Sequence, residues 1–211
     1  MGKFSECLQI QRGVTAVIGS GGKTSLLYRL AEELAEEGSV ILCTSTHILP
    51  PSHIPVTEHT GQVTGVICVG TPCEKGKLTA PRQPFSELAE LADYVLVEAD
   101  GSKRLPLKAH LSHEPVLPAE AENVICVVGA SGLGKAVTET AHRPERFALL
   151  GESDVATPLA VSKVLEKEAF HHRVLINQAE LAPALSLELA KLLSCPVVVA
   201  SLQKGEILCS Y

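Results

Sequence analysis

The segment VTAVIGSGGKTSLLYRLAEEL, residues 14–34, decides the fold of this chain. It opens with a run of apolar and β-branched residues that predicts a strand over Val14–Gly19. After a glycine-rich loop, apolar side chains recur at the spacing of one helical face (Leu26, Leu27, Leu30, Ala31 and Leu34). A strand, a glycine-rich loop and a helix in this order are typical of the first unit of a parallel α/β sheet.

The loop between this strand and this helix has the composition of a phosphate-binding loop. Glycines let backbone N–H groups approach a phosphate closely, and the N-terminus of the following helix favours negative charge. Lys23 offers a positive charge to β- and γ-phosphates, and the Thr24 hydroxyl is a ligand for Mg²⁺. The residues predicted to bind a nucleotide here are Gly19, Ser20, Gly21, Gly22, Lys23, Thr24 and Ser25.

The motif is a shortened one, because the full pattern G-x-x-x-x-G-K-[ST] requires glycine at position 17, where this chain has valine. The match is to G-x-x-G-K-[ST], the form found in Mur-type ligases. A glycine-rich turn with an incidental lysine is the alternative, and the flanking strand and helix favour phosphate binding. A second glycine-rich segment, Gly129–Lys135, has Ala136 where the hydroxyl is needed and poor helix formers after it. We interpret it as a connection.

Strand-length apolar runs alternate with helical patterns along the chain. This predicts a doubly wound, mostly parallel α/β sheet with helices on both faces, similar to P-loop NTPases. The predicted strands are Val14–Gly19, Val40–Thr44, Gly65–Val69, Tyr94–Glu98, Val124–Val128, Val174–Ile176 and Val197–Ala200. Further helices are predicted over Phe85–Ala92, from Thr157-Pro158 onward, and over Pro183–Leu193. Residues 46–61 and 101–122 are predicted as long loops, and residues 1–211 as a single domain.

The composition argues against several classes of function. The 211 residues carry 18 Lys and Arg against 24 Asp and Glu, a net charge of −6 without a basic block, so neither nucleic acid nor a membrane is expected as a partner. Aromatic residues make up 3%, too few for base-stacking platforms. The seven cysteines form no C-x-x-C pair and several lie in apolar runs, which predicts reduced thiols and a cytoplasmic protein.

Two carboxylates lie at the carboxyl end of the predicted strand Tyr94–Glu98. Glu98 and Asp100 are expected to point the same way, because side chains alternate along an extended chain. In open α/β sheets, ligands bind at this end of the parallel strands. We therefore predict Lys23, Glu98 and Asp100 as catalytic residues, and Thr24 and Asp100 as ligands of Mg²⁺.

The segment Asn177-Gln178-Ala179-Glu180 follows another predicted strand. It has the spacing of the N-K-x-D element of GTP-binding proteins, with Gln in place of Lys and Glu in place of Asp. Since a carboxylate can accept the N1–H and N2–H bonds of guanine, we predict Asn177 and Glu180 as base contacts and keep both ATP and GTP as candidates. Residues 44–47, 102–104, 108 and 142–144 are open to a ligand-binding role or an ordinary turn role.

The whole pattern resembles the YqeC family, accessory proteins associated with selenium-dependent molybdenum hydroxylases. The resemblance is carried by Gly19-Ser20-Gly21-Gly22-Lys23-Thr24, Thr44-Ser45-Thr46-His47, Val97-Glu98-Ala99-Asp100-Gly101-Ser102, Pro106-Leu107-Lys108, His113-Glu114-Pro115-Val116-Leu117-Pro118, His142-Arg143-Pro144-Glu145 and Asn177-Gln178-Ala179-Glu180. It implies a P-loop-type domain acting in maturation or cofactor insertion, with a molybdenum hydroxylase or its cofactor-loading enzymes as partners. The resemblance implies that Lys23 and Thr24 contact phosphate and Mg²⁺, and that Glu98 and Asp100 are site residues.

Three functions are compatible with these features. The first is a Mg²⁺-dependent NTPase, using ATP or GTP, that assists delivery or activation of the hydroxylase cofactor. The second is an ATP-dependent ligase or kinase acting on a small acidic acceptor, which the short loop and Lys103, Arg104 and Lys108 suggest. The third is a docking scaffold without catalytic activity.

Overall fold

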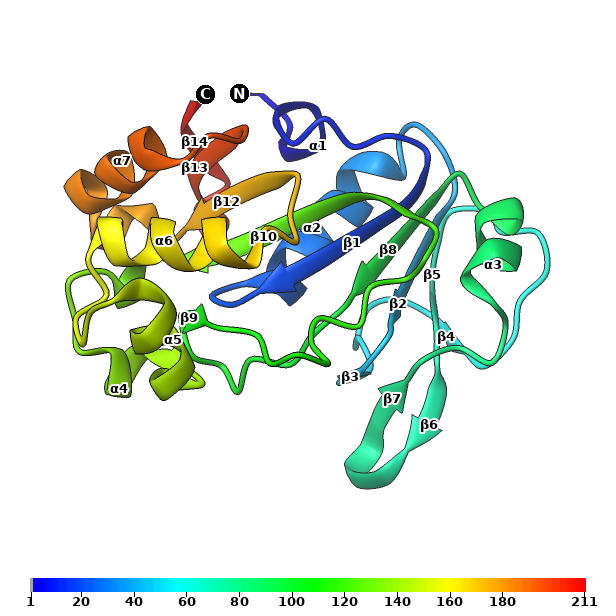
Figure 1. Cartoon of the computed structure of the whole chain (residues 1–211). Coiled ribbons are helices and arrows are strands. Elements are labelled where there is room, and N and C mark those ends of the chain that lie inside the picture. Colours follow the sequence, from blue (N-terminus) through cyan, green and yellow to red (C-terminus); the bar gives the residue numbers. More distant parts are fainter. Residues whose placement is uncertain (1) are drawn as a thin grey trace.

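A nine-stranded sheet forms the centre of the computed structural model, which describes residues 2–211 (Figure 1). The strand order is β14-β13-β12-β10-β1-β8-β2-β5-β4, and all neighbours pair in parallel except β13 and β14. The strands are β1 (Gly13–Gly19), β2 (Val40–Thr44), β4 (Val56–Thr57), β5 (Val66–Val69), β8 (Tyr94–Glu98), β10 (Ala121–Gly129), β12 (Arg173–Asn177), β13 (Val197–Ser201) and β14 (Glu206–Ser210). Every predicted strand is present, and the mostly parallel α/β fold is confirmed.

Helices cover both faces of this sheet, as predicted. One face carries α1 (Phe4–Cys7) and α2 (Lys23–Leu34); the other carries α3 (Phe85–Leu91), α5 (Pro144–Gly151), α6 (Pro158–Glu168) and α7 (Pro183–Leu192) (Figure 1). The alternation along β1 explains the two layers: Val17 packs with the leucines of α2, whereas Ala16 and Ile18 pack on the opposite side. The Thr157 hydroxyl accepts from the Ala160 N–H at 3.1 Å and caps α6.

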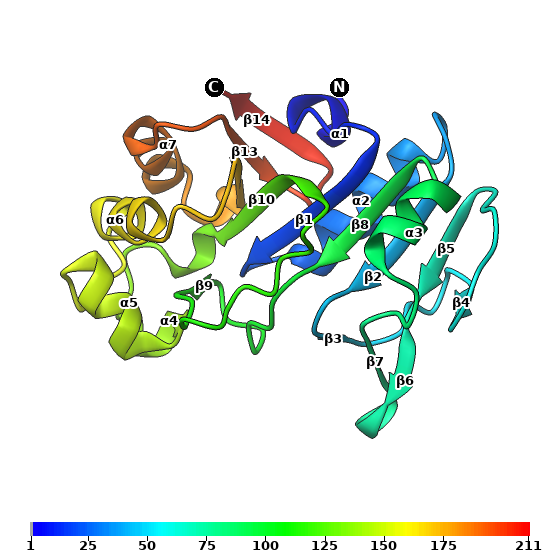
Figure 2. The same ribbon diagram turned by 45° about the vertical axis from the view of Figure 1, so that its right-hand side comes forward.

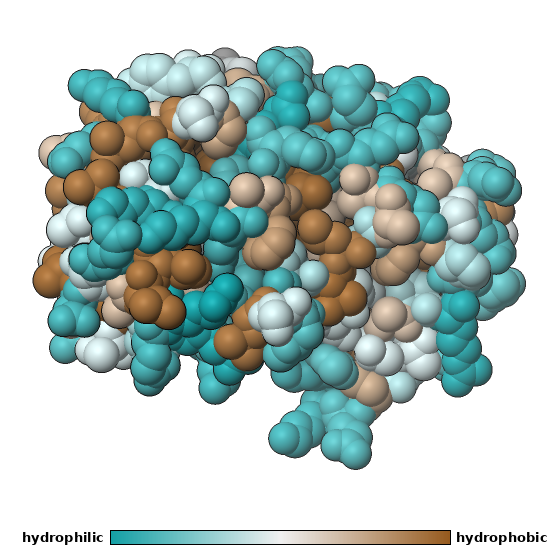
Figure 3. All heavy atoms as spheres, viewed as in Figure 1, coloured by the Kyte–Doolittle hydropathy of each residue, from teal (hydrophilic) through white to brown (hydrophobic). Residues whose placement is uncertain are grey.

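Several small elements were not predicted. They include α1, α5, β4 and β14, together with β3 (His47–Ile48), β6 (Thr71–Cys73) and β7 (Lys77–Thr79) in one sheet, β9 (Leu107–Lys108) paired with β11 (Ala141–His142), α4 (Val137–Thr140), and the 3₁₀ turns Glu74–Gly76, Ala130–Gly132 and Ala179–Leu181. The two predicted loops, 46–61 and 101–122, thus contain β3, β4, β9 and the start of β10, because such short pairings leave no hydrophobic period to detect. The β6–β7 hairpin projects from the molecule and is mainly hydrophilic (Figures 2 and 3).

The cysteine side chains are free thiols, as the sequence predicts. Cys43, Cys68 and Cys126 are buried, and burial raises the pKa of the Cys68 thiol to about 11. These thiols therefore act as small apolar core residues. Among residues 2–211, no helix combines the length and the apolar composition that crossing a bilayer requires.

The packing of the core around the central sheet can be tested at Leu96. Its side chain on β8 is 0% exposed, so Leu96→Ala should lower the free energy of unfolding by about 2–5 kcal/mol in urea denaturation. Leu149 on α5 is 72% exposed, so Leu149→Ala should change it by less than about 0.5 kcal/mol. Equal losses in the two variants would contradict this packing.

Candidate functional site

The glycine-rich loop lies at the carboxyl end of β1, where the chain turns into α2 (Figure 2). Gly21 and Gly22 have φ angles of +88° and +132°, which residues with a side chain rarely adopt. A Cβ on Gly21 would lie 2.4 Å from the Gly129 Cα, and a Cβ on Gly22 would lie 2.3 Å from the Asn177 Nδ2. The close packing of the loop against β10 and β12 therefore requires both glycines.

The first turn of α2 offers free backbone donors. Within the described part of the chain, the N–H groups of Gly22, Lys23 and Thr24 donate to no carbonyl or side chain. A helix cannot satisfy its own first N–H groups, and its dipole adds positive potential at the same end. Thr24 and Ser25 are exposed, so an anion can reach these donors. Free donors at a helix N-terminus are the feature by which many proteins bind phosphate groups.

Lys23 is buried beneath the loop, and its side chain is only 3% exposed. Its ammonium lies 2.9 Å from Asp100 Oδ1 and 3.9 Å from Glu98 Oε1. It also donates to the Gly19 carbonyl at 2.8 Å and to the Ser102 hydroxyl at 3.1 Å. A buried ammonium is tolerated only when it is paired and hydrogen-bonded. The structure thus brings together the three side chains that the sequence predicts as catalytic.

Glu98, rather than Asp100, lies beside the Thr24 hydroxyl, which donates to Glu98 Oε2 at 2.9 Å. That Thr24 and Asp100 bind Mg²⁺ stays a prediction, to which the structure adds Glu98, beside Thr24, as a third candidate. Burial raises the pKa of Glu98, and the charge of Lys23 partly offsets this. No group of three or more His, Cys, Asp or Glu side chains in residues 2–211 is arranged to hold a metal alone. A cation here would complete its shell with phosphate and water oxygens.

Asp100 begins a buried hydrogen-bonded chain that the sequence analysis did not identify. Its Oδ2 accepts from the Gly19 N–H at 2.8 Å and lies 2.7 Å from His110 Nε2. The other ring nitrogen of His110 lies 2.7 Å from Glu168 Oε2 at the end of α6. Burial alone would raise the pKa of Asp100, but His110 and Lys23 outweigh it and hold that pKa at about 2. His110 and Glu168 are 58 residues apart, so no local motif could reveal the pair.

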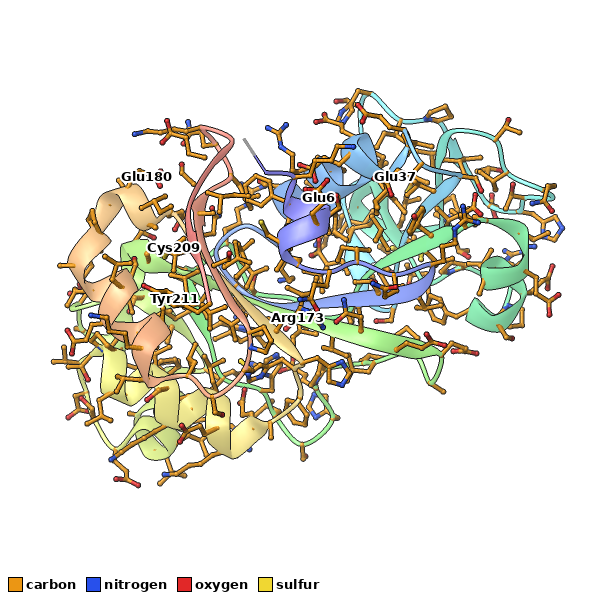
Figure 4. The ribbon with its side chains drawn as sticks, turned by 90° about the horizontal axis from the view of Figure 1, so that it is seen from above. Glu6, Glu37, Arg173, Glu180, Cys209 and Tyr211 are labelled. Carbon is orange, nitrogen blue, oxygen red and sulfur yellow. The ribbon has the colours of Figure 1, made fainter. Side chains whose placement is uncertain are left out.

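A cavity of about 380 Å³ opens beside the loop, against α2. Its walls include Gly22, Ser25, Tyr28, Arg29, Glu32, Asn177, Gln178, Glu180, Leu202 and Gln203. Asn177 connects two segments at the rim of the cavity, because its side chain donates to the Gly21 carbonyl at 2.7 Å and accepts from the Leu202 N–H at 2.9 Å. Glu180 extends from the 3₁₀ turn after β12, as Figure 4 shows, and its buried Oε2 has no partner within residues 2–211.

The glycines of the second glycine-rich segment allow close packing against Pro106 and Leu107. A Cβ on Gly129 would lie 2.8 Å from the Pro106 carbonyl oxygen, and a Cβ on Gly132 would lie 2.9 Å from Leu107 Cδ1. Lys135 is exposed, and the helix that follows, α4, has only four residues. This agrees with its interpretation as a connection rather than a phosphate site.

Comparison with known sequences identifies the family. A sequence model described as YqeC protein matches residues 15–145, well over half of the chain. The chain belongs to the YqeC family. The matched region includes the glycine-rich loop, Glu98 and Asp100, whereas Asn177 and Glu180 lie beyond it.

A YqeC protein of Escherichia coli (strain K12), described as uncharacterized, is 38% identical over 151 residues. The match covers 64% of this chain and 59% of that relative, so the chain spans less than two thirds of the length of the curated protein it matches. Family membership rests on the sequence model, and the name of this relative assigns no activity.

The pKa of Asp100 predicts an acid-sensitive contribution to stability. Because the folded pKa of about 2 lies below the unfolded value of about 3.9, ionised Asp100 stabilises the fold by about 2 kcal/mol above pH 4. This contribution is lost as pH falls from about 4 towards 2. Urea denaturation across this range should show a weaker pH dependence in Asp100→Asn. The exposed Asp154 provides the control, and a matching change in Asp154→Asn would contradict the assignment.

Proposed function

We propose that this chain is a Mg²⁺-dependent nucleoside triphosphatase that assists maturation of, or cofactor insertion into, a selenium-dependent molybdenum hydroxylase. The observation that carries the enzymatic part is the start of α2. There, free N–H groups, the Lys23 ammonium and the Thr24 hydroxyl meet the carboxylate of Glu98. The biological role rests on the resemblance of the chain to accessory proteins of such hydroxylases.

The charges around the loop support a requirement for a divalent cation. Lys23 already faces two carboxylates, Glu98 and Asp100, so its ammonium is not free to neutralise a triphosphate by itself. A triphosphate placed beside Glu98 without a cation would meet repulsion from that carboxylate. Thr24 and Glu98 would hold Mg²⁺, which supplies neutralisation of phosphate charge when bound. Asp100, whose side chain is 0% exposed, acts as a positioning residue that fixes the Lys23 ammonium.

The cavity beside α2 suits the base of the nucleotide. A buried carboxylate oxygen without a partner costs free energy, and a ligand that donates hydrogen bonds would satisfy it. Guanine presents adjacent N1–H and N2–H donors, whereas adenine presents an acceptor at N1. Glu180 therefore favours GTP over ATP.

Nucleotide binding by calorimetry tests the phosphate site. GTP should bind only with Mg²⁺, and Lys23→Met should weaken binding at least about tenfold, since it removes a charge-assisted contact. Glu98→Gln should raise the Mg²⁺ concentration that binding requires. Lys135→Met in the second glycine-rich segment is the matched control and should bind normally. Normal binding by a folded Lys23→Met variant would refute the site.

Base preference can be tested separately at the cavity. Glu180→Ala should weaken GTP binding about tenfold or more and leave ATP binding unchanged, because only guanine uses the carboxylate. Glu32 lines the same cavity with a side chain that is 64% exposed, so Glu32→Gln controls for a general charge effect. Equal weakening of GTP and ATP by Glu180→Ala would contradict guanine recognition.

A further inference from the structure

A second group of charged side chains lies beside Asp100, where β9 pairs with β11. The pairing places Lys108 opposite His142, and Arg143 follows as the N-cap residue of α5. The Lys108 side chain is 0% exposed, and its ammonium lies 3.5 Å from Asp100 Oδ2. Glu114 bridges the two cations, at 3.4 Å from Lys108 Nζ and 3.5 Å from a terminal guanidinium nitrogen of Arg143.

His142 is the unsatisfied member of this group. The residue is 7% exposed, and both ring nitrogens are buried without a hydrogen-bond partner among the described residues. Burial lowers the pKa of His142, and the charges of Lys108 and Arg143 lower it further. The neutral ring has one N–H to donate and one nitrogen that accepts. Buried polar groups are normally hydrogen-bonded, so a ligand that pairs with these two ring nitrogens would be stabilised here.

The charges around His142 determine what kind of ligand fits. The charge of Lys103 also lowers the pKa of His142, so three cationic side chains act on the ring electrostatically and one carboxylate, Glu114, opposes them. The Arg143 Nε is likewise buried without a partner within residues 2–211. The N-terminus of the eight-residue helix α5 starts at the same point and adds favourable potential for an anion.

We propose that Lys108, His142 and Arg143 form a binding site for the oxyanion group of a small second ligand, a carboxylate or a phosphate, which displaces Glu114. Lys108 and Lys23 contact the same carboxylate, Asp100, so this ligand would sit next to the phosphate loop. As the site of a second substrate it rests on the proposed nucleotide function. As an anion site it does not depend on that function.

A purely structural role for the Glu114 bridge makes a different prediction. If Glu114 only joins Lys108 to Arg143, loss of Glu114 or of Arg143 loosens the same contact, and both variants behave alike. If Glu114 competes with a ligand, the two variants have opposite effects. Arg143→Gln then weakens ligand binding, whereas Glu114→Gln strengthens it, because the internal competitor has lost its charge.

The test follows the ring ¹⁵N signals of His142 by NMR while inorganic phosphate or acetate is added. The signals are assigned from their loss in His142→Asn. Two samples separate this site from the loop: protein saturated with GDP and Mg²⁺, and the Lys23→Met variant without nucleotide. In both, one phosphate or one acetate per chain should shift the signals. The stronger probe identifies the oxyanion as phosphate or carboxylate.

Arg143→Gln should weaken this binding about tenfold, and Glu114→Gln should tighten it. Arg82, also loosely paired with a carboxylate at 3.9 Å, supplies the matched control Arg82→Gln, which should bind as the parent does. Unshifted His142 signals with both probes, or weakening by Glu114→Gln as well as by Arg143→Gln, would overturn the proposal. Failure of GDP to bind would refute the nucleotide function alone, because the Lys23→Met sample still reports on His142.

Discussion

The burial of the Lys23 ammonium is the constraint on which the rest of the site depends. The Lys23 side chain is 3% exposed, so its charge needs opposite charges and hydrogen-bond acceptors around it. The strand β8 supplies the Glu98 carboxylate, because the pairing of β8 with β1 places Glu98 opposite Val17. The carboxylates of Glu98 and Asp100 therefore balance the charge that lies beneath the loop. Thr24 at the start of α2 is held by the same strand end, through Glu98.

Asp100 connects the surroundings of Lys23 to other parts of the molecule. One carboxylate accepts from the Gly19 N–H, pairs with Lys23, lies near Lys108 and contacts His110, which continues to Glu168 on α6. A single buried side chain thus joins the loop, the segment after β8 and the helical layer on the far side of the sheet. The two proposed ligand sites lie next to each other because Lys23 and Lys108 both contact this residue.

The strand order explains why so many functional groups meet at one place. From β1 the chain goes to β2 on one side, returns through β8 next to β1, and then crosses to β10 on the other side. Segments from both halves therefore meet beside the carboxyl end of β1, the position at which open α/β sheets bind ligands (Figure 2). The cavity with Glu180 lies against α2, whereas the His142 cluster lies where β9 meets β11.

The sequence alone determined the parallel α/β fold, the glycine-rich loop between β1 and α2, and the carboxylates at and just beyond the end of β8, because strands, helix faces and glycine turns are encoded by neighbouring residues. The sequence also predicted that Gly129–Lys135 is a connection and not a phosphate loop, since a missing hydroxyl and poor helix formers are local features. The tertiary structure decided the rest. Only folding joins Thr24 to Glu98, His110 to Glu168 and Lys108 to His142, since these contacts cross between elements far apart in the chain and leave no periodic pattern in it.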